Sequence, residues 1–187
     1  MAGLNYLSYG SWSIALSNFR STSDAGSYVA GYQSPASAMP TTGTAHYSST
    51  SYGVTGTVYV TNGGTTTSAA LMGTANLDVD FAASSIKGTL DHINYSKDGM
   101  SGGFNDIAVS ANIASGTSTF SGTTAATTAG SSYYALKPTA TGQINGAFYG
   151  PTPKEMGAIW TLSNGDGTGV AVGAVGAQYL TGSGSLH

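Results

Sequence analysis

The chain has no cysteine and very little charge. Its 187 residues include five Lys/Arg and eight Asp/Glu, only one of them a glutamate, and its formal net charge is −3. Without cysteine it can form neither disulfides nor thiolate metal sites, and it has no cysteine nucleophile. Without a basic stripe it has no electrostatic support for binding phosphates. We therefore expect no nucleic acid partner.

Long apolar runs and the common enzyme motifs are also missing. No apolar run approaches the roughly 20 residues of a membrane-spanning helix. No segment has the pattern of a signal peptide, so we expect any export signal to lie outside this chain. The sequence contains no G-x-S-x-G elbow, P-loop or H-E-x-x-H motif. We expect neither a transmembrane helix nor an enzyme.

The residues that are abundant favour strands. The chain is 40% hydrophobic and contains 28 Gly and 12 Tyr, and period-two alternation recurs between turn signals. In residues 75–83, for example, Leu77, Val79 and Phe81 alternate with polar side chains. Strands are expected at 6–16, 26–32, 43–60 (two short strands), 75–83, 85–95, 106–114, 117–129, 141–150, 157–163 and 169–180. Loops are expected at 33–42, 97–103 and 130–140, and a hairpin turn at Asn62-Gly63.

Short connections between antiparallel strands favour a closed sheet, because closure removes exposed strand edges. We predict an all-β fold, an antiparallel up-and-down barrel of about eight strands; a β-sandwich has the same alternation. Residues 1–180 are expected to form one domain, with an N-terminal strand region (1–39) and a barrel core (40–180). We interpret 181–187 as a linker or tag remnant.

The stretch GAFYGPTPKEMGAIW, residues 146–160, concentrates rare residues of the chain. Pro151 fixes φ and ends a strand, and Pro153 suits the first position of a helix. Glu155 would then meet free amides at the positive end of a helical turn. We therefore predict one short helical turn near 152–156 and a structural role for Glu155, since general acid–base chemistry needs a second titrating group nearby.

The same stretch resembles the signature of the C-lobe β-barrel of transferrin-binding protein B and its relatives. The matching residues are Gly146, Phe148, Tyr149, Gly150, Pro151, Glu155 and Gly157. Residues 40–53, PTTGTAHYSSTSYG, resemble the Gly-x-Ala-x-Tyr strand that opens such barrels, whereas Ala158 stands where a second glycine is usual. The resemblance implies a non-enzymatic binding protein at the surface of, or secreted by, a Gram-negative bacterium. Its implied ligand is a host iron source, either a host protein or haem.

Two histidines are candidate haem ligands, because some relatives of this barrel bind haem and imidazole is its commonest axial ligand. In the predicted strand 85–95, His92 lies on the same face as Leu90. His46 lies in another predicted strand, directly before Tyr47. Supporting contacts are expected from Tyr47, Tyr52, Met72 and Met100. The ordinary alternative is that each histidine is a surface residue of its strand. Apart from haem, no cofactor is expected.

The tyrosines offer a second kind of site. Tyr133 and Tyr134 are paired in a predicted loop, where aromatic side chains make good protein contacts. The alternative is that they straddle the barrel wall. Asp78 and Asp80 share one strand face but lack the spacing of a calcium loop, so we expect no metal site.

Two other functions remain open. One is a structural or host-association (adhesion) module of the same fold without a role in iron uptake. The other is a small outer-membrane barrel, although the strands lack a continuous apolar band with aromatic girdles. Purification without detergent separates these possibilities, and we expect a monomer.

Overall fold

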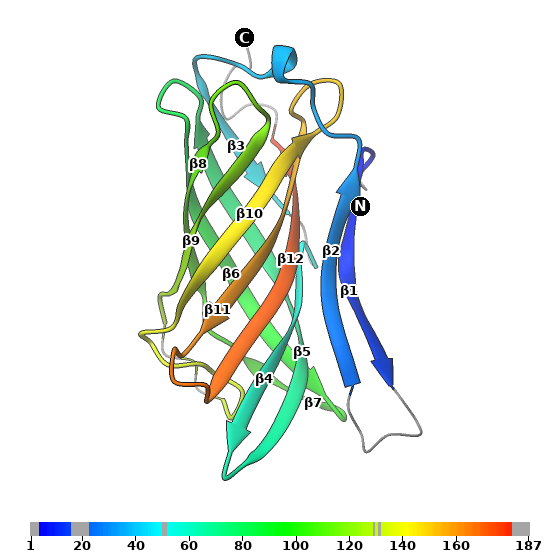
Figure 1. The fold of residues 1–187 in the computed structure, drawn as a ribbon, viewed down its shortest axis with the longest axis vertical. Coiled ribbons are helices and arrows are strands. Elements are labelled where there is room, and N and C mark those ends of the chain that lie inside the picture. Colours follow the sequence, from blue (N-terminus) through cyan, green and yellow to red (C-terminus); the bar gives the residue numbers. More distant parts are fainter. Residues whose placement is uncertain (1–3, 16–22, 50–51, 129, 131, 181–187) are drawn as a thin grey trace.

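The computed structural model describes residues 4–15, 23–49, 52–128, 130 and 132–180 (Figure 1). The tail 181–187, which we interpreted as a linker or tag remnant, lies outside them. Twelve strands and one 3₁₀ turn, η1 (Ala36–Ala38), make up the described fold. The strands are β1 (Leu7–Ala15), β2 (Ser23–Gly31), β3 (Thr44–Ser48), β4 (Val54–Asn62), β5 (Thr65–Asp80), β6 (Ser85–Lys97), β7 (Met100–Gly103), β8 (Ile107–Ile113), β9 (Thr119–Ala126), β10 (Thr141–Tyr149), β11 (Glu155–Ser163) and β12 (Gly169–Tyr179).

Eight of these strands form a closed antiparallel barrel. Neighbours along the chain pair with each other in the order β4, β5, β6, β8, β9, β10, β11 and β12, and β12 pairs with β4 to close the ring. β3 fills the space beside β4 by pairing with both β5 and β12. β7 folds back and pairs with the C-terminal end of β6, residues 94–97. The predicted up-and-down barrel of about eight strands is therefore confirmed.

Two hairpins differ from the sequence expectation. The Asn62-Gly63 turn is where it was predicted, with Gly63 and Gly64 at φ +57° and +81°, but β5 begins directly after it rather than at residue 75. The predicted loop 97–103 is instead a tight hairpin, in which Asp98 and Gly99 have φ of +49° and +79° and β7 follows. Residues 65–74 of β5 and residues 100–103 of β7 were not predicted as strand, because most of them are small or hydroxylated and give no clear apolar alternation.

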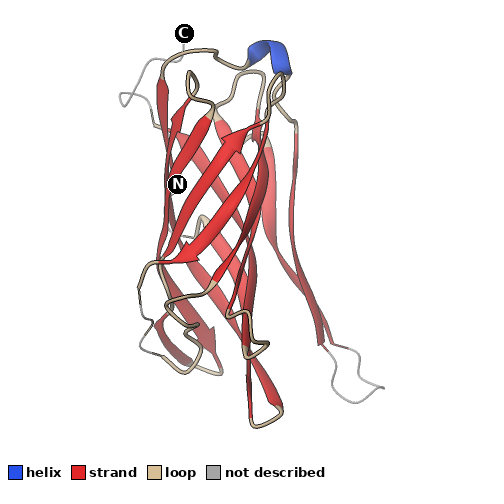
Figure 2. Cartoon of the chain, turned by 60° about the vertical axis from the view of Figure 1, so that its left-hand side comes forward, coloured by secondary structure: helices blue, strands red, loops and turns tan. Residues whose placement is uncertain are grey.

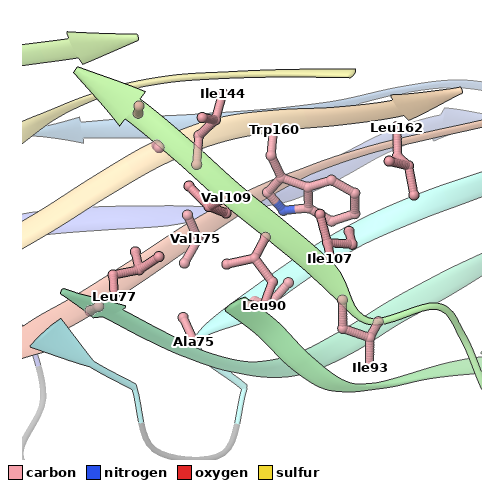
Figure 3. Close-up of a cluster of buried hydrophobic side chains, with 14 of the residues drawn as sticks. Ala75, Leu77, Leu90, Ile93, Ile107, Val109, Ile144, Trp160, Leu162 and Val175 are labelled. Atoms are coloured by element: carbon pink, nitrogen blue, oxygen red, sulfur yellow. The ribbon is translucent and has the colours of Figure 1, made fainter. Parts of the chain in front are cut away.

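Side chains fill the barrel interior. The inward-facing residues of the barrel strands are mostly apolar, with Thr124 of β9 a buried polar exception, and Figure 3 shows Trp160, Leu90, Ile107 and Ile144 among those that meet inside. Trp160 is fully buried, and its indole ring packs against the facing glycines of the next two strands, Gly173 and Gly56. An eight-stranded barrel is just wide enough for such packing. A ligand must therefore bind to the outer wall or to the loops.

Replacing Gly173 by alanine is expected to destabilise the protein by about 3 kcal/mol, through overpacking of the core. A methyl group at this position would lie 2.4 Å from Trp160 Cζ2 and 2.2 Å from the Thr55 carbonyl oxygen. Urea unfolding measures the loss. Gly103→Ala is the matched control, because a methyl group there meets no atom within 4 Å. Equal stabilities of the two variants would contradict the packing of Trp160 described above.

The N-terminal strands form a separate hairpin on the outside of the barrel (Figures 1 and 2). β1 pairs only with β2, and the hairpin packs on β12, β11 and β4. Its contact with the barrel is a small apolar cluster, Leu7, Ala147 and Tyr149 with Leu4, Tyr9 and Val29 around them. After β2 the chain joins the barrel through a bridge between Gln33 and Tyr149.

The corner between β10 and β11 is a turn rather than a helix. Tyr149 pairs with Glu155 as the first rung of the β10–β11 ladder, so β11 already includes Glu155 and Met156, and residues 150–153 form a turn. Gly150 provides the bend, with φ +102°. The helical turn predicted near 152–156 is therefore wrong. The helical element of the described residues is η1, within the predicted loop 33–42.

Candidate functional site

A β-bulge places His92 on the outer wall of the barrel. Ile86 and Leu90 point into the core, but the pairing of β5 with β6 shifts between Met72 and Thr74, and Ile93 is the next buried residue. His92 has φ +51°, and the Asp106 carboxylate accepts its backbone N–H at 3.1 Å. One extra residue inverts the alternation, so the expected shared face with Leu90 is wrong. The His92 side chain is 83% exposed.

The neighbouring Asp91 holds the imidazole of His92. Asp91 Oδ1 lies 3.1 Å from His92 Nδ1 and also accepts the hydroxyl of Thr74. Its other oxygen accepts Asn76 Nδ2 at 3.1 Å and Thr89 Oγ1 at 3.2 Å. Burial raises the pKa of Asp91, but these four hydrogen bonds outweigh it and leave that pKa below its ordinary value. The carboxylate is therefore charged at neutral pH.

This contact orients the imidazole ring. Because Nδ1 faces the carboxylate, Nε2 on the opposite side of the ring is directed away from the Asp91 network. A carboxylate on one ring nitrogen is the usual partner of a histidine that ligates a metal through the other, because it fixes the tautomer and raises basicity. The geometry thus makes His92 Nε2 a competent ligand atom.

His92 lines a groove on the outer wall of about 380 Å³. The groove is built from β5, β6, β7 and the connection between β3 and β4, and its lining residues are Tyr52, Met72, Gly73, Thr74, His92, Asn94, Tyr95, Ser96 and Ser101. Three residues predicted from the sequence, Tyr52, Met72 and His92, therefore meet at one site. Met100 is exposed on β7 but is not part of the lining.

The N-terminal hairpin supports one wall of this groove. Tyr52 is 57% exposed with φ +78°, a conformation that a bulky residue rarely adopts. Its carbonyl oxygen accepts the hydroxyl of Tyr9 at 3.0 Å. The position of Tyr52 thus depends on β1, which the sequence did not indicate.

The tyrosine pair of the loop 130–140 lies next to the groove. Tyr134 is buried, with its ring 4.9 Å from that of Tyr95 and 5.2 Å from that of Tyr133. Tyr133 is exposed. Of the two tyrosines expected at a protein contact, only Tyr133 is therefore available at the surface, and Tyr134 supports Tyr95 from inside.

His46 and Tyr47 lie elsewhere. Tyr47 is fully buried, packs on Phe148 and donates its hydroxyl to the Pro153 carbonyl; burial raises the pKa of its phenol. It is a core residue and cannot reach a surface ligand. His46 points outward into a second groove of about 420 Å³, where its Nδ1 lies 2.6 Å from Asp78 Oδ1. The two histidines thus line separate grooves.

The residues of the Gly-Pro corner hold the N-terminal hairpin. Glu155 is 2% exposed, and its carboxylate accepts the backbone N–H groups of Asn5, Tyr6 and Leu7 at 2.6, 2.9 and 3.1 Å. A side chain at Gly157 would meet Leu7 and Val29. Glu155 does meet free amides as expected, but they belong to a segment about 150 residues away in the chain.

Two further observations concern the described part of the chain. Its side chains include no group of three His, Cys, Asp or Glu placed to hold a metal ion. Among its elements there is no helix with the length and apolar character needed to cross a membrane.

Solved structures with the same fold come from several bacteria. A mutant transferrin-binding protein B of Haemophilus parasuis is 19% identical with a TM-score of 0.66, over 95% of this chain and 33% of that one. The isotype 1 transferrin-binding protein B of Neisseria meningitidis is 23% identical with a TM-score of 0.58, over 95% of this chain and 32% of that one. HpuA from Kingella denitrificans, solved in complex with human haemoglobin, is 16% identical with a TM-score of 0.53. The similarity covers 96% of this chain and 57% of that one.

These likenesses concern the fold, and the chain spans about one third of the length of the transferrin-binding proteins. No curated protein sequence matches it. Residues 39–178 match the family described as C-lobe and N-lobe beta barrels of Tf-binding protein B. That match extends from residues before β3 to the penultimate residue of β12. The chain therefore belongs to the family of transferrin-binding protein B β-barrels.

Proposed function

We propose that this protein is a non-enzymatic binding protein, exposed at the surface of a Gram-negative bacterium or secreted by it, that captures a host iron source. Family membership supports this function, because members of the fold include transferrin-binding proteins and a protein solved with haemoglobin. The observation that carries the proposal for this chain is the oriented His92 in its groove.

Haem is the form of iron that best fits this groove. Its volume falls in the range of ligand sites, about 300–1,000 Å³. His92 Nε2 would ligate the iron, with Asp91 behind the imidazole. Tyr52, Met72 and Tyr95 supply aromatic and thioether surface for the porphyrin. Haem here is the cargo, held at an open surface from which a receptor can take it.

The same side chains do not form a hydrolytic site. Thr74 Oγ1 lies 3.5 Å from His92 Nδ1, the same nitrogen that faces Asp91. A nucleophile–base–carboxylate relay needs the hydroxyl and the carboxylate on opposite ring nitrogens. The arrangement favours ligation over catalysis.

Titration with haemin tests the proposal. We expect a shifted Soret band that saturates at one haem per chain in the parent protein. His92→Gly should abolish the shift, and glycine readily adopts the positive φ of this position, so the barrel should still fold.

His46→Ala is the matched control, since it removes the other strand histidine from the second groove. Its Soret shift should equal that of the parent. A parent without any shift, or a shift that survives His92→Gly, would contradict haem capture at this groove.

A further inference from the structure

The hairpin turns an aromatic face away from the barrel. Leu7, Tyr9 and Val29 lie on the face that packs on the barrel. Successive side chains of a strand point to opposite faces, so the even-numbered residues lie on the other face of the hairpin. There, Trp12 is 46% exposed, Tyr28 43% and Tyr32 65%. Single exposed aromatics are ordinary, but three on one face of a two-stranded sheet require an explanation.

Two of these rings lie flat on glycines of the opposite strand. Trp12 pairs with Gly26, and a methyl group at Gly26 would lie 2.7 Å from Cε2, 2.7 Å from Cζ2 and 2.9 Å from Nε1 of the indole. Tyr28 pairs with Gly10, and a methyl group there would lie 3.2 Å from its Cε1. Near-equal distances to several ring atoms mean that the Trp12 ring is seated face-on. Its second face is therefore presented to solvent.

The surface around these rings is hydroxylated and uncharged. Residues 4–12 and 26–34 contain no charged side chain. Ser8 lies between the aromatic residues, with Oγ 3.5 Å from the Tyr28 hydroxyl. Apart from the ring faces, this neutral surface has no group that attracts an anionic or cationic ligand. It is also flat, so it lacks the enclosure of an aromatic cage.

The platform is also small. An aromatic side chain buries about 150–250 Å², so the exposed parts of Trp12, Tyr28 and Tyr32 together offer roughly 250–400 Å². A stable protein interface takes about 800 Å² from each partner. The face is therefore too small to hold a second copy of the chain or a protein partner on its own.

We propose that this face binds the neutral glycan chains of glycoproteins. The C–H groups of a sugar ring carry partial positive charge and pack on the negative face of an aromatic ring. The diagonal neighbours Trp12 and Tyr28 would each take one ring of the chain, and Ser8 and the Tyr28 hydroxyl would bond to sugar hydroxyls. The site goes beyond the proposed capture of iron, because it uses a different surface from the His92 groove.

The tryptophans of the chain make the test direct. Trp160 is fully buried and Trp12 is exposed, so a ligand on the hairpin changes only the emission of Trp12. The probes are N,N′-diacetylchitobiose and lactose, followed by a glycoprotein that carries neutral N-glycans and the same protein after enzymatic deglycosylation. We expect a saturable change in emission with at least one disaccharide, and capture of the glycosylated form but not the deglycosylated form.

Variants assign the effect to the platform. Tyr28→Ala should weaken disaccharide binding at least about fivefold, whereas Tyr28→Phe, which keeps the ring but loses the hydroxyl, should weaken it less. Tyr133→Ala, which removes an exposed tyrosine elsewhere, should leave it unchanged. Trp12→Ala should abolish capture of the glycoprotein, with Trp160 emission reporting that the barrel is folded. Equal capture of both glycoprotein forms would mean a protein contact and overturn the proposal. No response to any probe, or a response that Tyr28→Ala leaves intact, would overturn it as well.

Discussion

Glu155→Gln is expected to lower the free energy of unfolding by about 3 kcal/mol and to release the N-terminal hairpin. The buried carboxylate accepts three backbone N–H groups, from Asn5, Tyr6 and Leu7. Glutamine keeps one acceptor oxygen and places an NH₂ donor against the remaining amides. Hydrogen bonds to a charged group contribute about 1.5–3 kcal/mol each, and a buried amide left without a partner costs about 1–3 kcal/mol.

Urea unfolding and amide hydrogen exchange together test this effect. The amides of residues 5–7 should lose far more protection in Glu155→Gln than the strands of the barrel, since the Glu155 carboxylate accepts the backbone N–H groups of the N-terminal segment. Asp98→Asn is the control, because that carboxylate is an exposed group in the β6–β7 turn. If Glu155→Gln were as stable as Asp98→Asn, the carboxylate would not hold the hairpin.

Asp91→Asn is expected to weaken haemin binding about 10- to 100-fold, the usual effect of removing the partner behind a ligating histidine. The substituted asparagine would keep the size of the side chain and an acceptor oxygen but lose the negative charge that polarises the imidazole of His92. Its amide oxygen can still accept the hydroxyl of Thr74 and its NH₂ can donate to the hydroxyl of Thr89, so the bulge should persist.

The control for this effect is Asp78→Asn, which makes the same change behind His46. Its haemin affinity should match that of the parent. A stability measurement on Asp91→Asn separates loss of ligation from loss of fold: we expect a large change in affinity with a small change in the unfolding midpoint. Unchanged affinity would mean that Asp91 does not position His92.

The barrel itself could be predicted from the sequence because apolar and polar residues alternate along its strands, which indicates the side chains that are buried. Leu77, Val79 and Phe81 alternate with polar residues, and every second residue is buried. The corner at Gly150 was also predictable, since Pro151 ends a strand through its fixed φ. These signals are local, and the closed sheet follows from them once each strand pairs with its neighbour in the chain.

The features that could not be predicted, the partners of Glu155 and the bulge at His92, depend on contacts between distant segments. Nothing around Glu155 indicates that its partners are the amides of Asn5, Tyr6 and Leu7, so its carboxylate was assigned to a helical turn that does not form. The bulge at His92 has no local signal either, because alternation simply continues through Asp91 in the sequence.

The candidate site was predicted in part for the same reason. Tyr52, Met72 and His92 were singled out by residue type, and the fold places them around one groove. Tyr47 was singled out in the same way and lies in the core. Asp91, which orients His92, was missed because its role follows from the bulge that turns His92 to the outer face on which Asp91 lies.

The most direct test of haem ligation by His92 is chemical rescue of His92→Gly. The variant is mixed with haemin, and imidazole is then added while the Soret band is recorded. If His92 Nε2 is the iron ligand, the variant should show no shift until imidazole restores the parent spectrum, and Asp91→Asn in the same background should reduce the rescue. A His92→Gly variant that already has the parent spectrum, or one that imidazole fails to restore although it is folded, would contradict haem capture at His92.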